Sequence, residues 1–119
     1  YQKSSGEWAD TDALTLRASS ALAASENGAW VELGDRTQLR LTLTVTAVSG
    51  TSPTLDVSIE TASDSSGSNA TTIGTFAQKT AAASQYLICS GVGRFVRYVA
   101  TLGGSASPTV THSLMGEAV

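Results

Sequence analysis

The sequence predicts an all-β protein, an antiparallel β-sandwich of jelly-roll-like form with seven to eight short strands and an extended N-terminal arm. Apolar and polar side chains alternate with period two through much of the chain, as on strands with one buried face. Turn-forming clusters recur about every 8–12 residues, which is typical of sandwiches and related barrels. The chain also holds 17 Ser and 16 Thr but only 14% charged residues, and Thr suits the solvent face of a strand.

The first residues differ in character from the rest of the chain. Residues 1–12 are polar except for Trp8 and predict the arm, which leaves residues 13–119 as a single sandwich domain. A length of 119 residues suits one domain. Within the first third we expect a strand at 13–17, a mildly helical segment at 18–24, a turn at 25–28 and a short strand around Trp30 to Leu33.

The clearest alternation lies in residues 38–48, where Leu39, Leu41 and Leu43 share one face with Val45 and threonines occupy the other. Residues 54–61 repeat this pattern after a cluster of turn-forming residues at 49–53. We therefore expect these two strands to pair as a hairpin.

Four weaker strands complete the prediction. Glycine-rich turns separate the last three, and the segment at 103–108 reads as a hairpin loop. The predicted strands are residues 71–79, 85–90, 94–102 and 109–119.

The charge balance argues against nucleic acid as a partner. The net charge is −3, and the seven Lys and Arg residues are scattered, whereas phosphate binding requires basic clusters. No apolar run approaches the length of about 18 residues that a membrane-spanning helix needs. We expect neither a nucleic-acid nor a membrane partner.

No set of residues predicts catalysis, so we expect a protein that is not an enzyme. His112 could act as a base beside a hydroxyl, but its strand position fits a hydrogen-bonded sheet or interface histidine. Cys89 could be a nucleophile, but its alternation with Leu87 fits a buried structural thiol.

Metal and cofactor sites are equally unsupported, and we expect none. Asp64, Ser66 and Asn69 resemble part of a calcium loop, but the further oxygen ligands at fixed offsets are missing. Asp56 and Glu60 share a strand face and could act as paired carboxylates. A solvated loop and a solvated strand face are the simpler interpretations.

Candidate partner-binding residues come from the arm and from one strand. Trp8 could anchor in a partner's pocket or form a platform for a sugar ring, whereas Trp30 is expected in the core. Arg94 and Arg97 could bind a partner carboxylate through bidentate bonds, or lie along the surface with their charged heads in water.

Three blocks carry a resemblance to a known family. They are residues 39–67 (LRLTLTVTAVSGTSPTLDVSIETASDSSG), 72–80 (TIGTFAQKT) and 93–119 (GRFVRYVATLGGSASPTVTHSLMGEAV). With these blocks in this order along the chain, the sequence resembles the small virion structural proteins of tailed bacteriophages, especially head-decoration or cement proteins. One departure is the loop at 64–70, which lacks the Trp that family members often carry there.

The resemblance implies a capsid decoration protein on the outer surface of the virion, assembled in the host cytoplasm. It implies two partners: the major capsid protein of a tailed phage, and other copies of this chain, expected as a homotrimer. We expect the arm to add a strand to an exposed edge of the shell protein. The predicted partner-binding residues are Tyr1, Lys3, Trp8, Arg94 and Arg97.

Two other interpretations remain open. One is a carbohydrate-binding or adhesive β-sandwich module, which would use an aromatic platform. The other is a neck or tail component of the virion with the same fold.

Overall fold

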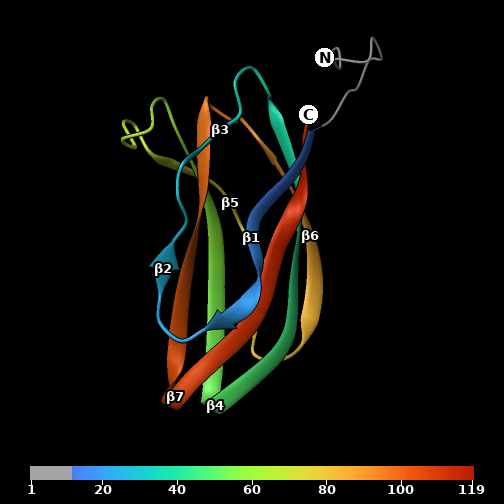
Figure 1. Ribbon diagram of the computed structural model, residues 1–119, viewed down its shortest axis with the longest axis vertical. Helices are drawn as coiled ribbons and strands as arrows, with labels where there is room; N and C mark the ends of the chain where they lie inside the picture. Colours follow the sequence, from blue (N-terminus) through green and yellow to red (C-terminus); the bar gives the residue numbers. More distant parts are fainter. Residues whose placement is uncertain (1–11) are drawn as a thin grey trace.

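The computed structural model describes residues 12–119, and these form an antiparallel β-sheet of seven strands (Figure 1). This confirms the all-β, antiparallel prediction. The strands are β1 (Asp12–Leu22), β2 (Glu26–Asn27), β3 (Val31–Glu32), β4 (Gln38–Ala62), β5 (Thr71–Thr75), β6 (Ala83–Ser90) and β7 (Phe95–Ala118).

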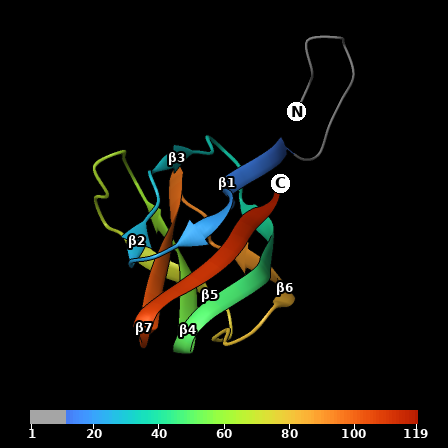
Figure 2. The same ribbon diagram turned by 60° about the horizontal axis from the view of Figure 1, so that its bottom comes forward.

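Two long strands organise the whole sheet. β4 and β7 pair with each other over almost their full lengths, from Leu39 opposite Ala118 to Ala62 opposite Phe95. Both strands turn back on themselves halfway along, at the lower end of the molecule in Figure 1 and nearest the viewer in Figure 2. The result is one continuous two-stranded ribbon with a bend in its middle.

The bend depends on glycines that face prolines of the other strand. Gly50 and Gly104 have φ angles of 92° and 117°, which L side chains rarely adopt. A Cβ on Gly50 would lie 2.7 Å from the Cα of Pro108, and one on Gly104 would lie 3.0 Å from the Cα of Pro53. Close backbone approach and positive φ therefore both require glycine at these two positions.

The predicted hairpin between residues 38–48 and 54–61 is wrong. Both segments belong to β4, and each pairs with β7 instead of with the other. The expected hairpin loop at 103–108 is likewise the bend within β7. The turn-forming residues do change the chain direction, but they do so in two paired strands at once, so the ladder between β4 and β7 continues past the bend.

The shorter strands extend the ribbon on each side of the bend. β1 pairs with β7 from Asp12–Ala118 to Leu22–Val110, and β6 pairs with β4 from Gln38–Ser90 to Val45–Ala83. Beyond the bend, β5 pairs with β4, while β2 and β3 pair with β7. The expected helical segment at 18–24 is a misassignment, because β1 continues as strand through Leu22.

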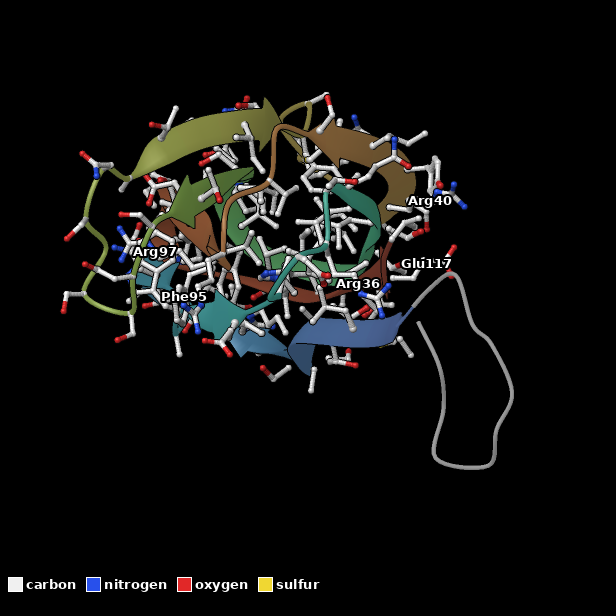
Figure 3. The ribbon with its side chains drawn as sticks, turned by 90° about the horizontal axis from the view of Figure 1, so that it is seen from above. Arg36, Arg40, Phe95, Arg97 and Glu117 are labelled. Carbon is white, nitrogen blue, oxygen red and sulfur yellow. The ribbon has the colours of Figure 1, made fainter. Side chains whose placement is uncertain are left out.

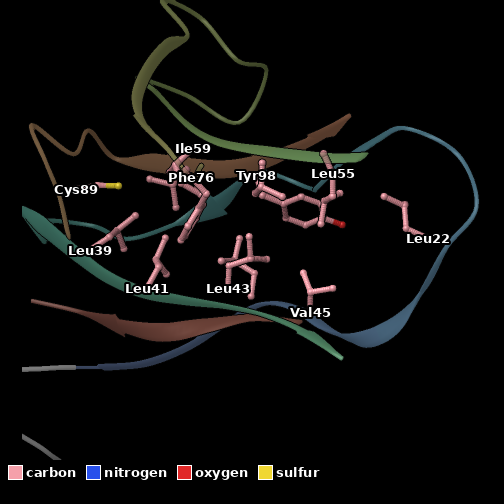
Figure 4. Close-up of a cluster of buried hydrophobic side chains, with 14 of the residues drawn as sticks. Leu22, Leu39, Leu41, Leu43, Val45, Leu55, Ile59, Phe76, Cys89 and Tyr98 are labelled. Atoms are coloured by element: carbon pink, nitrogen blue, oxygen red, sulfur yellow. The ribbon is translucent and has the colours of Figure 1, made fainter. Parts of the chain in front are cut away.

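The core lies on the inner face of the bent ribbon (Figure 4). The inward side chains of residues 38–45 face the inward side chains of residues 55–59, which lie beyond the bend. Alternation with period two in these two parts of β4 therefore supplies one shared core. Its largest fully buried apolar side chains are Leu39, Leu41, Leu43, Leu55, Val57, Ile59, Phe76, Val96, Val110 and Leu114.

Candidate partner interface

The predicted partner-binding residues divide into two groups. Tyr1, Lys3 and Trp8 lie outside the described residues. Arg94 lies just before β7 and Arg97 near the start of β7. Arg97 is close to Trp30, which in turn lies near Gly67 of the loop at 63–70.

Arg97 is held within the chain. Its Nε donates a hydrogen bond to Oε1 of Glu60 at 2.8 Å, and its guanidinium lies 4.6 Å from the centre of the Trp30 ring. Gly67 also lies against this ring, since a Cβ there would be 3.1 Å from the indole. Trp30 is thus a half-buried surface platform for Arg97, and its predicted place in the core is wrong.

Arg94 is more available than Arg97. Its side chain is 63% exposed and pairs with Glu32, with 3.1 Å between Nε and Oε2. Exposed ion pairs of this kind contribute little stability, because water screens them. A carboxylate of a partner can therefore compete for Arg94 at small cost, whereas Arg97 would have to leave both Glu60 and Trp30.

Sequence reasoning missed a broad exposed surface on the outside of one part of the ribbon, the part that contains residues 38–45 of β4 and the end of β7. We call it the outer face, and its members alternate with the buried core residues of β6, β4, β7 and β1. One row across these strands is Tyr86, Thr42, Met115 and Thr15; the next is Ile88, Arg40, Glu117 and Ala13.

Three large apolar side chains are exposed on this outer face. Tyr86 is 56%, Ile88 53% and Met115 44% exposed, and these are the exposed large hydrophobic residues of the described part of the chain. Alternation with Leu87 and Cys89 already places Tyr86 and Ile88 outward. Tyr86 and Ile88 are next to each other on the outward side of β6, and Thr42 alone separates Tyr86 from Met115 in the sheet. Exposed apolar patches on a protein surface mark interaction sites.

Sequence reasoning also missed a buried polar cluster that joins β1, β2 and β7. Arg17 is only 8% exposed. It donates hydrogen bonds to Glu26 Oε1 at 2.8 Å, to the carbonyl of Ser20 at 2.9 Å and to the carbonyl of His112 at 2.7 Å. The Tyr98 hydroxyl donates to the same Glu26 oxygen at 2.9 Å. We call Arg17, Glu26, Tyr98 and His112 the Arg17 cluster.

The position of Arg17 explains why its role was missed. Simple alternation after inward-facing Leu14 and Leu16 would turn Arg17 toward solvent. Register shifts between Thr15 and Arg17 and between Arg17 and Ser20 break the alternation, and bulges of this type re-aim a side chain. Arg17 consequently points inward.

Three side chains of the Arg17 cluster, those of Glu26, Tyr98 and His112, have a shifted pKa. The hydrogen bond from Arg17 lowers the pKa of Glu26, because it stabilises the carboxylate. Burial lowers the pKa of His112, and burial together with the hydrogen bond to Glu26 raises the pKa of Tyr98. The ordinary charge states are therefore an ionised Glu26 beside a neutral His112 and a neutral Tyr98.

His112 and Cys89 occupy the structural positions predicted for them. Each side chain is about 1% exposed, and His112 Nδ1 lies 3.2 Å from the carbonyl oxygen of Val110. Burial raises the pKa of the Cys89 thiol. The described surroundings of Cys89 thus favour the neutral thiol.

The carboxylates considered as metal or acid–base groups have separate partners. Asp64 Oδ1 accepts hydrogen bonds from the backbone N–H groups of Ser66 and Ser68, and bonds from Ser68 lower its pKa. Asp56 accepts from Gln78, while Glu60 binds Arg97. Asp56 is therefore bound by an amide and Glu60 by a guanidinium, so the two carboxylates have separate partners.

Residues 12–119 enclose no pocket and contain no group of three or more potential metal ligands. No helix within them has the length and apolar character needed to cross a membrane.

Comparison with known proteins gives no family assignment. No family model matches the sequence, and no curated protein matches it significantly.

Proposed function

We propose that this chain is a virion structural protein, a decoration or cement protein that binds the outer surface of a tailed-phage head as an oligomer and stabilises the shell. We also propose that the bent sheet forms a sandwich of jelly-roll type, in which the two parts of the ribbon are the two layers. The inward side chains of both parts meet in one core, as such a packing requires.

The proposal is carried by the position in the fold of the sequence blocks that resemble the phage proteins. The block at residues 39–67 covers nearly all of β4, and the block at 93–119 covers all of β7. These two strands form the ribbon on which the other strands pair. The resemblance therefore concerns the element that determines the fold, rather than a peripheral loop.

The shell contact is proposed to involve the arm and the adjacent exposed arginine. Arg94 is exposed and weakly paired, so it can bind an acidic group of the major capsid protein. Tyr1, Lys3 and Trp8 would contribute from the arm. Arg97 has a supporting role in this scheme, because it fixes Trp30 beneath the loop at 63–70.

Sedimentation of particles from the native source tests the proposal. We expect the chain to travel with the particles at a near-stoichiometric ratio to the major shell protein. A ratio of a few per cent would instead identify a neck or tail component. Absence from particles would contradict a virion role and leave carbohydrate binding, which the exposed Tyr86 ring favours and a glycan array would detect.

The arm has a separate test in the same binding assay. Removal of residues 1–11, which precede β1, should abolish binding to undecorated particles, while the circular dichroism spectrum and melting temperature remain those of the full chain. Arg94→Glu should weaken binding because it reverses the charge offered to the shell. Full binding by the truncated chain would contradict the role of the arm.

A further inference from the structure

We propose that the outer face is a self-association surface: it docks on the same face of a second copy of this chain, related by a two-fold axis. The axis runs between β4 and β7 and lies parallel to these strands. This inference concerns the protein in solution and does not depend on the proposed role in the virion.

The first argument is the charge pattern of the face. Arg40 on β4 and Glu117 on β7 are cross-strand neighbours (Figure 3), with 3.8 Å between Nη1 and Oε1 and 40% of each side chain exposed. This separation is longer than the usual charge-assisted hydrogen bond of about 2.8 Å. Both groups therefore retain hydrogen-bonding capacity for a second partner.

The proposed rotation makes the charges complementary. A two-fold axis between β4 and β7 exchanges the two strands at the same height along the sheet. Arg40 then faces Glu117 of the partner subunit, and Glu117 faces Arg40 of the partner subunit. Two additional unlike contacts form, and within the two rows named above no like charges are brought opposite each other. Such an arrangement favours specific association.

The apolar residues fit the same rotation. The axis places β6 over β1 of the partner subunit, so Ile88 meets Ala13 of the partner subunit and Tyr86 meets Thr15 of the partner subunit. Met115 meets Thr42 of the partner subunit in the same way. Each large exposed side chain is thus set against a small one, which allows two sheets to approach to the usual distance of about 10 Å.

The area of the outer face limits how much surface the dimer can bury, and therefore how tightly the two copies can bind. Four strands about 4.8 Å apart, each contributing about eight residues at ~3.4 Å per residue, cover roughly 500 Å². A pair of such faces buries about 1,000 Å² in total, which is near the lower limit for a specific interface. We therefore expect a reversible dimer whose population depends on concentration.

The symmetry follows from the use of identical faces. Two copies that pack through the same residues must be related by a two-fold axis, whereas a cyclic trimer joins two different patches. The face therefore specifies a dimer, and this differs from the homotrimer that the family resemblance implies.

Sedimentation velocity of the full chain, from micromolar to millimolar concentration, tests the proposal. We expect a monomer–dimer equilibrium. Glu117→Arg should weaken the dimer at least tenfold, because it places arginines opposite each other. Arg40→Glu should do the same, and the double charge swap Arg40→Glu with Glu117→Arg should restore the dimer.

Two further variants complete the experiment. Tyr86→Ser should weaken the dimer through lost apolar contact, while its melting temperature stays close to that of the wild type because the ring is exposed. Ser65→Arg, on an exposed site outside the face, should leave the dimer unchanged. A monomer at all concentrations, a trimer, or a dimer that both Glu117→Arg and Tyr86→Ser leave intact would overturn the proposal.

Discussion

Arg17 links β1 directly to β2, two strands that both pair with β7 in the sheet. Its guanidinium bonds to the β2 carboxylate of Glu26 and to the carbonyl of His112 in β7, while its own backbone lies in β1. Tyr98 completes the link from the other half of β7. Removal of one partner from such a network leaves the others buried without hydrogen bonds.

Arg17→Met should therefore destabilise the protein strongly. Methionine preserves much of the side-chain volume but leaves the carbonyls of Ser20 and His112 without their donor and Glu26 without its counterion. We expect a loss of about 3 kcal/mol in the free energy of unfolding, measured by urea denaturation. Arg94→Met is the matched control, and loss of its exposed ion pair should cost at most about 1 kcal/mol.

His112 should make the stability depend on pH. Burial lowers its pKa in the folded state, so the unfolded chain binds a proton more readily. The free energy of unfolding should consequently fall as the pH drops below the ordinary histidine pKa of about 6.5, and level off below the folded-state pKa. Glu26, whose folded pKa is lowered, should add a second loss at more acidic pH.

His112→Gln isolates this effect, because the chain contains a single His. Glutamine keeps a donor for the carbonyl of Val110 but does not titrate. Urea denaturation at a series of pH values should show that the slope near the histidine pKa disappears in this variant. An unchanged slope would assign the pH dependence to other groups.

At the level of the elements, the bend is the most constrained part of the ribbon. Gly50→Ala would add a Cβ 2.7 Å from the Cα of Pro108 and also force alanine into a φ of 92°. Conformational strain alone costs on the order of 1–2 kcal/mol, and the backbone clash adds to it. We expect a loss of about 3 kcal/mol in urea denaturation.

Gly91→Ala separates the two causes. Gly91 has a φ of 72°, but a Cβ there would meet nothing within 4 Å. This variant should therefore show the conformational cost without the clash. Equal losses for Gly50→Ala and Gly91→Ala would mean that the close approach to Pro108 contributes nothing.

The bend also defines how far the fold could be predicted from sequence. Alternation correctly assigned the inward faces of residues 38–45 and 54–61, because a pleated strand imposes period two on burial. It does not extend past Val45, since the register shifts between Val45 and Ala47. Composition located the changes of direction at 49–53 and 103–108. It did not show which segments pair, since a turn-rich cluster is compatible with a hairpin or with a bend in a continuous ladder.

The candidate interface was predictable only where alternation holds. The outward positions of Tyr86 and Ile88 follow from a regular strand, but their proximity to Met115 depends on the register of β6, β4 and β7. The inward position of Arg17 depends on register shifts in β1. The pairing of Arg97 with Glu60 and Trp30 joins three separate segments, so local sequence gave no sign of it.

For the whole molecule, Cys89 provides a measure of cooperative unfolding. The thiol is about 1% exposed, burial raises its pKa, and it is the single cysteine of the chain. Native protein should react slowly with a thiol-specific reagent, and the rate should rise with urea in parallel with loss of β-structure. Rapid stoichiometric labelling in native buffer would show that this part of the sheet opens locally.

The pairing of β4 with β7 finally determines the order in which the molecule can assemble. β7 follows β4 at a distance in the sequence, and its residues from Phe95 to Ala118 form the ladder with β4. The nascent β4 therefore leaves the ribosome well before its main partner has been synthesised, and meanwhile exposes its leucine-rich face. The ladder can first close at Ala62–Phe95, where the intervening loop is shortest, and then lengthen toward Leu39–Ala118. Folding should thus be slow, as for other chains dominated by distant strand pairs.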